Sequence, residues 1–288
     1  MAPLFQHRLR PLRDIVSSWE ESNFEVKNYL TGWYWLSDGW YCLQTDDGDV
    51  PLAHSAFVAS LGLSGENALY LDYQVARFWM DLVEVVPAAL ESLPEPFAEW
   101  VVSGVWPAWV AEVQTWWQAL DDEDPASSDE TWDDLFAARR WWNARHIDMG
   151  YLVAPPGLRF WCLGDTVTLQ WDTRDRLVEG RPCWVEKIGQ QEMSVSSFEQ
   201  EINSFRRRLD QDMGSRIQEV ESLGLLSAEQ VAGLWRQHEE ILAMRGRWEG
   251  TDWQEVKAAV AYLEHLSGIS VKACGGSQPG VRSFSDGP

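Results

Sequence analysis

The sequence has 288 residues, of which 45% are hydrophobic and 24% are charged. These values are typical of a globular protein and exclude wholesale disorder, collagen and a coiled coil. The net charge of −22 disfavours binding to nucleic acid or to an anionic membrane. No apolar run reaches the roughly 20 residues of a membrane span, and the first residues lack the apolar stretch of a signal peptide. We therefore expect a cytoplasmic protein.

The acidic residues are concentrated in one part of the chain. Residues 14–138 contain 24 Asp and Glu against only Lys27 and Arg77, whereas residues 139–288 contain 21 acidic and 18 basic residues. This distribution favours a basic protein partner that docks on residues 14–138. Solubility alone is an alternative reason for the acidity.

The first expected element is a β-hairpin at residues 26–46. Aromatic and β-branched residues fill positions 28–36, Ser37-Asp38-Gly39 supplies a turn, and residues 40–45 form the returning strand. The tryptophans are unusually frequent, 19 in all. The cluster Trp33-Tyr34-Trp35 cannot all face one side of a strand. A sheet covered on both faces, or an exposed aromatic binding surface, would accommodate it.

Helical patterns follow the hairpin. Residues 68–93 carry apolar side chains at steps of three and four residues, with Pro87 expected to end or kink the helix. A second helical segment, 96–120, is interrupted by glycine and proline. The acidic stretch 121–130 predicts a mobile loop, and residues 131–145 predict a short helix with a threonine N-cap.

The remaining chain predicts strands and then helices. Residues 158–171 read as strand, turn and strand, and residues 183–189 as a further strand. A capping box at Ser196–Glu199 opens a helix that continues to about residue 223. Similar start signals at Ser227 and Thr251 predict two more helices, and the tail after Ile269 is rich in Gly, Ser and Pro.

These elements predict an α+β fold. A small antiparallel sheet from residues 26–46, 158–171 and 183–189 should pack against the helices at 68–93 and 196–223. The C-terminal third should be mostly helical. We expect an α+β domain at residues 1–223, a helical extension at residues 224–269 and a disordered tail at residues 270–288.

No sequence motif indicates a metal or a cofactor. Four cysteines lack CxxC spacing, and five histidines form neither HxxxH nor HExxH. The P-loop, GxGxxG and GxSxG patterns are also absent. We therefore propose no metal site and no cofactor from the sequence.

Two clusters combine charged side chains with large aromatic rings. The first contains Asp72, Tyr73, Arg77 and Asp81. Arg77 and Asp81 are four residues apart, so they can pair on one helix face, and Asp81 with Glu84 could serve acid–base chemistry or hold a cation. A solvated face with one ordinary ion pair explains the same pattern more simply.

The second cluster contains Trp142, His146, Asp148, Tyr151, Arg159 and Trp161. His146 and Asp148 could act as a base and its orienting carboxylate, although a structural hydrogen-bonded pair is the preferred explanation. We hypothesise that His146, Asp148, Tyr151 and Arg159 meet Asp72 and Arg77 in one concave polar patch walled by tryptophan.

Three segments together resemble a known family. Gly32–Tyr41, Tyr70–Leu82 and His146–Trp161 resemble, in this order, a bacterial family of unknown function, DUF5984. The resemblance spans roughly residues 5–220, with the helical part after about residue 225 outside it. It implies no established reaction, cofactor or catalytic residue.

The sequence supports three functional hypotheses and leaves open whether the protein is an enzyme. The first is a non-enzymatic acidic protein that neutralises or regulates a basic protein partner, as an immunity protein or antitoxin-type inhibitor does. The alternative is a small-molecule enzyme or ligand-binding protein with a tryptophan-lined pocket. The third is a mimic of nucleic-acid charge.

Overall fold

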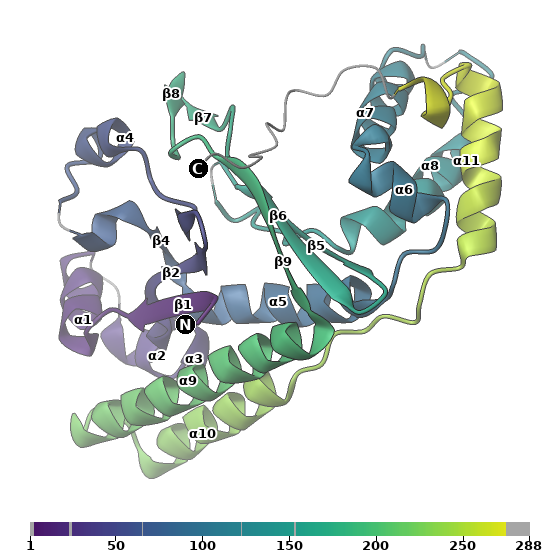
Figure 1. Cartoon of the computed structure of the whole chain (residues 1–288). Coiled ribbons are helices and arrows are strands. Elements are labelled where there is room, and N and C mark those ends of the chain that lie inside the picture. Colours follow the sequence, from purple (N-terminus) through teal and green to yellow (C-terminus); the bar gives the residue numbers. More distant parts are fainter. Residues whose placement is uncertain (1–2, 23–24, 65, 122, 153, 275–288) are drawn as a thin grey trace, which may run out of the picture. The chain divides into compact units, whose positions relative to one another are not determined.

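The computed structural model describes residues 3–22, 25–64, 66–121, 123–152 and 154–274 (Figure 1). The chain divides into two compact units, each built from two separate segments. The first unit contains Met1–Leu90 and Arg145–Trp248, and the second contains Glu91–Ala144 and Glu249–Pro288. The predicted helical extension at residues 224–269 is thus shared between the two units.

The first sheet of the first unit is organised around one central strand. Its strands are β1 (Phe5–Leu9), β2 (Asp38–Thr45), β3 (Gly48–Val50) and β4 (Leu71–Gln74). Strand β2 pairs antiparallel with the three others. Gly39 lies opposite Leu9 in the β1–β2 ladder. A Cβ at Gly39 would lie 2.3 Å from the backbone oxygen of Arg8, so this close approach requires glycine.

The second sheet is an antiparallel meander in the order β5-β6-β9. Its strands are β5 (Gly157–Leu163), β6 (Thr166–Asp172) and β9 (Ile188–Ser194). The predicted strand–turn–strand at residues 158–171 is confirmed, with Gly164 at φ +59° in the turn. A short hairpin, β7 (Leu177–Val178) with β8 (Arg181–Pro182), lies between β6 and β9 in the chain.

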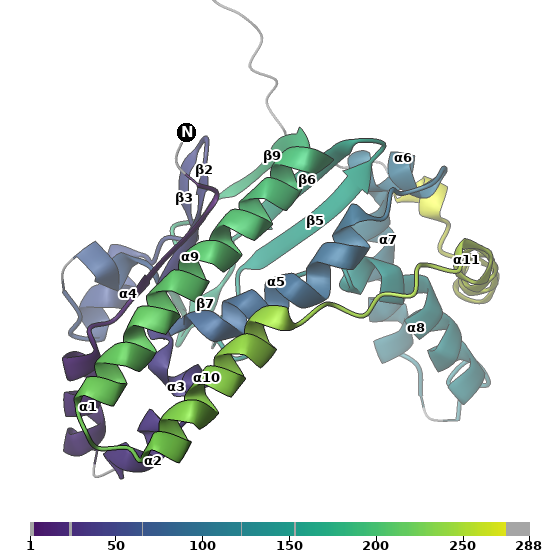
Figure 2. The same cartoon turned by 90° about the horizontal axis from the view of Figure 1, so that it is seen from below.

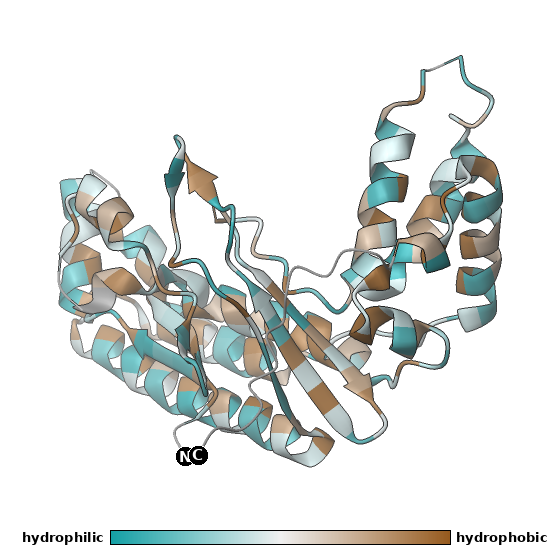
Figure 3. Cartoon of the chain, turned by 45° about the horizontal axis from the view of Figure 1, so that its top comes forward, coloured by the Kyte–Doolittle hydropathy of each residue, from teal (hydrophilic) through white to brown (hydrophobic). Residues whose placement is uncertain are grey.

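Helices cover both sheets of the first unit. They are α1 (Leu12–Glu21), α2 (Val26–Leu30), α3 (Trp33–Leu36), α4 (Ser55–Ser60), the 3-10 helix η1 (Glu66–Leu69), α5 (Val75–Leu90), α9 (Val195–Ser222) and α10 (Ala228–Ala243). Helix α5 contacts β2 and β5, whereas α9 contacts β1 and β9. Helix α10 runs back beside α9 (Figure 2). Hydrophilic and hydrophobic residues alternate around α9, as expected for a helix with one buried face (Figure 3).

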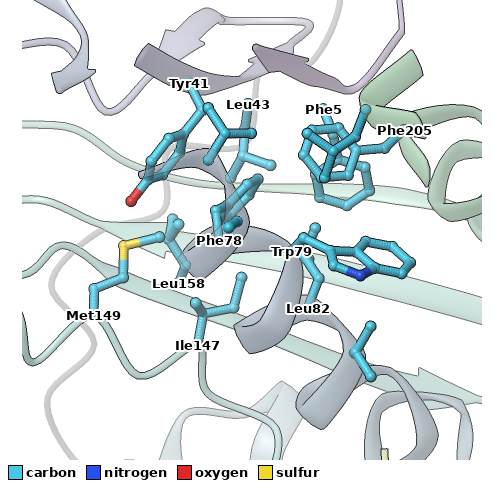
Figure 4. Close-up of a cluster of buried hydrophobic side chains, with 14 of the residues drawn as sticks. Phe5, Tyr41, Leu43, Phe78, Trp79, Leu82, Ile147, Met149, Leu158 and Phe205 are labelled. Atoms are coloured by element: carbon cyan, nitrogen blue, oxygen red, sulfur yellow. The ribbon is translucent and has the colours of Figure 1, made fainter. Parts of the chain in front are cut away.

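The core of the first unit lies between these layers (Figure 4). Phe5 of β1 places its ring 6.1 Å from that of Phe78 on α5 and 6.0 Å from that of Phe205 on α9. Tyr41 of β2 stacks on Phe78 at 4.5 Å. Burial of each such side chain stabilises the fold by about 1.5–3 kcal/mol, so these rings hold the first sheet against α5 and α9.

The second unit is helical in its described part. Its elements are α6 (Phe97–Val102), α7 (Val105–Gln118), α8 (Asp129–Asn143), α11 (Trp253–Ser267) and the 3-10 helix η2 (Val271–Ala273). Its core is aromatic: the rings of Phe97 and Trp253 lie 4.9 Å apart, and those of Trp106 and Trp141 lie 5.0 Å apart. Pro107 lies in the first turn of α7, where a backbone N–H has no helical partner to lose.

The structure confirms the α+β class and the helical C-terminal part, but the expected hairpin at residues 26–46 is wrong in its first half. Residues 26–36 form α2 and α3, and β1 takes the place of the expected strand. Trp33 and Leu36 are both fully buried. A helical turn brings these two side chains to one face, whereas an extended strand would point them to opposite faces.

Other boundaries differ from the expected ones. The helix expected at residues 68–93 begins only at Val75, after strand β4, and continues past Pro87 to Leu90. The strand expected at residues 183–189 lies later, as β9. The strands form separate sheets instead of one. Helix α8 begins at Asp129 with Ser128 as its N-cap.

Two of the three helix starts predicted in the last third match their sequence signals. The capping box expected at Ser196–Glu199 is wrong, because α9 begins at Val195 and its N-cap is Ser194, whose side chain accepts the Ser197 N–H. Ser227 and Gln230 form a complete capping box at α10, and Asp252, the residue after Thr251, caps α11. Of the tail expected to be disordered, residues 271–273 form η2, and residues 275–288 lie outside the described residues. None of the described helices has the length and apolar content needed to cross a bilayer.

Candidate functional site

The junction of β4 and α5 positions three of the expected site residues. Tyr73 lies at the end of the strand, and Arg77 and Asp81 follow at four-residue steps on the helix. Buried Ser37 fixes the helix start: its backbone oxygen accepts the Val75 N–H at 2.9 Å, and its Oγ accepts the Ala76 N–H at 3.1 Å. This cap satisfies two N–H groups that the first helical turn leaves without partners.

Asp81 is a buried carboxyl with an incomplete set of partners. Its side chain is only 6% exposed, and its Oδ1 lies 3.2 Å from Nε of Arg77. Asp81 also shares a hydrogen bond with Tyr151, but its Oδ2 is buried without a hydrogen-bond partner among the described residues. Burial raises the pKa of Asp81 to about 7; Arg77 and Tyr151 oppose the rise, whereas Asp148 and Glu84 add to it.

Four tyrosines surround this carboxyl and its arginine. The hydroxyls of Tyr41 and Tyr151 are 2.8 Å apart, and the ring of Tyr73 stacks on that of Tyr151 at 4.5 Å. Tyr34 and Tyr73 share a hydrogen bond, and burial is the main cause that raises the pKa of Tyr34 to about 12. The Arg77 guanidinium lies 5.4 Å from the centre of the Tyr151 ring, within cation–π range.

His146 lies beside a second group of charges. It forms an isolated antiparallel bridge with Arg159 at the start of β5. Burial is the main cause that lowers the pKa of His146 to about 4; Arg159 contributes to the shift, and Asp148 opposes it. The imidazole is therefore neutral at neutral pH. Asp148 accepts the Gly150 N–H at 2.9 Å through Oδ1, so its carboxylate also shapes the loop.

Arg159 belongs to a locally basic group in this acidic protein. Burial is the main cause that lowers the pKa of Arg159 to about 9, and nearby Arg145, which is fully buried, contributes to the same shift. Burial is the main cause that keeps His146 neutral, and the positive charge of Arg159 adds to it despite Asp148.

The structure brings some of the expected site residues together and separates others. Tyr151 contacts Tyr73, Arg77 and Asp81, and Arg77 pairs with Asp81. Asp148 acts electrostatically on both Asp81 and His146. These contacts arise because the loop before β5 returns to the start of α5.

Asp72 has a different partner, and Trp142 and Trp161 belong to other elements. Asp72, the neighbour of Tyr73, accepts two hydrogen bonds from Arg10 at 2.7 and 2.6 Å, consistent with the alternation of side chains along a strand. Trp142 is buried in α8 of the second unit, and Trp161 is buried in β5.

Sequence reasoning missed Tyr34 and Tyr41. Both join the cluster through Tyr73 and Tyr151, which are distant in the chain. Only the tertiary fold brings them together, so no local spacing signalled them.

Sequence reasoning also missed an exposed surface on α8. We call this surface the α8 outer face and define it as Asp129, Trp132, Asp133 and Phe136. Trp132 is 48% and Phe136 55% exposed, and both aspartates are exposed. These positions recur at three- and four-residue steps opposite the buried face of the helix. The regular spacing of this face was the signal available in the sequence.

Negative charge is crowded beside the α8 outer face. Burial raises the pKa of Asp134, and the neighbouring carboxylates of Glu130, Asp133 and Glu255 raise it further. Glu255 belongs to α11, so the acidic region extends from α8 onto a second helix of the same unit. The ring of Trp132 lies 6.0 Å from that of Trp117 on α7, which supports the exposed indole from one side.

The chemistry available at these places differs. Asp81 can exchange a proton near neutral pH beside an arginine and hydroxyl groups, as a general acid or base requires. The α8 outer face offers carboxylates and aromatic faces to a large partner. No group of three or more His, Cys, Asp or Glu within the described part of the chain is arranged to hold a metal ion.

Comparison with known proteins identifies the family alone. No curated protein and no solved structure matches the chain. The family model described as "Family of unknown function (DUF5984)" matches residues 4–259. This match continues past the limit near residue 220 that the resembling motifs indicated, through α10 and into α11. The chain therefore belongs to the DUF5984 family.

Proposed function

We propose that the protein binds a basic protein partner through the α8 outer face and thereby neutralises or regulates that partner. The observation that carries this proposal is the exposure of Trp132 and Phe136, one helical turn apart, beside Asp129 and Asp133. Large exposed aromatic side chains are common anchors of protein interfaces, and carboxylates around them select for lysine and arginine.

The distribution of charge supports the same surface. The two segments of the second unit contain 17 acidic and 5 basic residues, a balance of −12 out of −22 for the whole chain. Such a field accelerates the encounter with a basic protein and repels an acidic one. The aromatic pair would then supply affinity after the encounter.

A defined peptide tests the surface directly. The probe is a synthetic peptide of alternating lysine and leucine, and its Kd is measured by calorimetry. We expect the double variant W132S/F136S to raise Kd about tenfold or more. We expect D129N/D133N to weaken binding mainly at low salt, where charges are least screened.

A charge-matched control separates this face from general acidity. The variant D46N/D47N removes the same number of exposed carboxylates from the turn after β2 in the first unit. It should bind the peptide like the wild type, and equal weakening in D46N/D47N would contradict the proposal. For a partner captured by cross-linking and then purified, its own activity should fall with the wild type and recover with W132S/F136S.

Asp81 supports a second candidate function, small-molecule binding or catalysis in the first unit. Its Oδ2 is buried without a hydrogen-bond partner among the described residues, and its pKa lies near neutrality. A carbodiimide with glycinamide modifies protonated carboxyl groups that solvent can reach. Modification of Asp81 at neutral pH, located by peptide mass spectrometry, would support this candidate. An unmodified Asp81 in the folded protein would reject it.

A further inference from the structure

A cavity of about 400 Å³ lies between α5, α9 and the segment that follows α10. All of its lining residues belong to the first unit. One side is apolar and includes Trp79, Val83 and Leu90 of α5. The volume is in the range of small-molecule sites, and the apolar side favours a ligand with a hydrocarbon or aromatic body.

Two arginines line the same cavity. Arg206 comes from α9, and Arg245 comes from the segment after α10. The carboxylate four residues after Arg206, Asp210, instead lies 2.9 Å from Nε2 of His238. None of the ion pairs between described residues includes Arg206. Arg245 donates through Nη1 to the backbone oxygens of Ala243 and Met244.

The charge at the cavity is opposite in sign to that of the whole protein. Glu199 is the one acidic residue of the lining, against the two arginines, whereas the chain carries −22. Guanidinium groups bind carboxylates with strong, directional hydrogen bonds. The lining therefore favours an anionic group next to an apolar body.

Gly246 allows the segment that carries Arg245 to pack closely against α5. Pro87 has no N–H, so the carbonyl of Val83, four residues earlier in α5, lacks its usual helical donor. Gly246 packs against this carbonyl: a Cβ there would lie 2.1 Å from the Val83 oxygen and 2.9 Å from Cγ of Pro87. The segment after α10 can approach α5 this closely because residue 246 has no side chain.

We propose that this cavity binds an amphipathic carboxylate, a small molecule whose apolar body lies against Trp79 and Val83 and whose carboxylate contacts Arg206 and Arg245. This site is separate from the α8 outer face and does not depend on the function proposed for that face. The ligand class follows from the joint presence of an apolar wall and a surplus of guanidinium groups.

Octanoate is the test ligand, with octanol and octylammonium as neutral and cationic analogues of the same chain length. Calorimetry should show one saturable octanoate site per chain and weaker binding of both analogues. The variant R206Q should raise the Kd of octanoate about tenfold. Equal binding of octylammonium, or no saturable binding of octanoate, would overturn the proposal.

Two matched variants make the result specific. Arg207→Gln removes the same charge from the next residue of α9, which is exposed and outside the cavity lining, and should leave the Kd unchanged. Asn203→Trp places a large ring at the cavity and should abolish binding. Equal weakening in R207Q would show general electrostatic attraction and reject the site. W132S/F136S should bind octanoate normally, which separates this test from that of the α8 outer face.

Discussion

The indole N–H of Trp33 donates to Nδ1 of His238 over 3.0 Å, and this bond fixes the tautomer of the imidazole. Nδ1 must accept, so the ring proton is on Nε2, which faces Oδ1 of Asp210 at 2.9 Å. Trp33 is fully buried and His238 is 6% exposed. The short helix α3 is thereby attached to α10, and α10 to α9.

Replacement of His238 by alanine should lower the free energy of unfolding by about 1–3 kcal/mol, because the buried indole N–H loses its acceptor. Urea denaturation followed by circular dichroism measures the change. His265→Ala, at an exposed histidine of α11, is the control and should leave the urea midpoint nearly unchanged. An unchanged midpoint in H238A would show that the bond contributes nothing to stability.

Asp81 should make the protein less stable as the pH rises. In the unfolded chain this carboxyl loses its proton near its ordinary pKa of 3.8, but in the fold it does so at about 7. Between these values the folded state holds more protons, so the free energy of unfolding falls with rising pH. Asp81→Asn should remove this slope and be more stable than the wild type at pH 8. If the free energy of unfolding of the wild type and of Asp81→Asn changed with pH in the same way, the raised pKa of Asp81 would be contradicted.

His146 should make the protein more stable as the pH rises, the opposite of the effect of Asp81. Its pKa falls from an ordinary 6.5 to about 4 in the fold, so the unfolded state binds more protons between these values and acid destabilises the protein. His146→Gln should flatten the profile between pH 4 and 6.5, measured by urea unfolding at each pH. The double variant D81N/H146Q should lose both slopes, and a slope that persists there must come from other groups.

A methyl group at Gly39 should disrupt the β1–β2 pair. The added Cβ would lie 2.3 Å from the Arg8 oxygen and 2.9 Å from Cα of Leu9, which predicts a loss of about 1–3 kcal/mol for Gly39→Ala. Hydrogen exchange of the β1 amides should become faster. Gly233→Ala in α10 meets only one side-chain atom at 3.7 Å and should stabilise the protein by about 0.5–1 kcal/mol. Equal effects of both changes would refute the steric argument.

The sequence predicted those parts of the fold in which residues close together in the chain all favour the same secondary structure. Ser227 and Gln230 supplied both halves of a helix cap, and the turn at Gly164 linked two alternating strands, so α10 and the β5–β6 hairpin were predictable. The strand predicted at residues 28–36 is wrong because packing overrides the strand preference of the aromatic side chains there. Trp33 needs His238, which is 205 residues away in the chain.

The candidate site was predictable to the extent that it lies on one helix. Arg77 and Asp81 were paired by their four-residue spacing, which the structure shows as an ion pair. Asp72 was placed with them because the sequence pattern did not separate strand β4 from helix α5. The contacts of Tyr151 with Tyr41 and Tyr73 join residues about 80 to 110 positions apart, which no local pattern contains.

The division of each unit into two chain segments has a consequence for synthesis. Helices α6, α7 and α8 leave the ribosome early, but α11, which packs against α8, follows only after the whole segment Arg145–Trp248. Until then the Trp141 ring lacks its contact with Trp253. The nascent chain therefore carries an uncovered tryptophan surface while the rest of the first unit is being made, and in that interval it is most exposed to aggregation and to capture by chaperones.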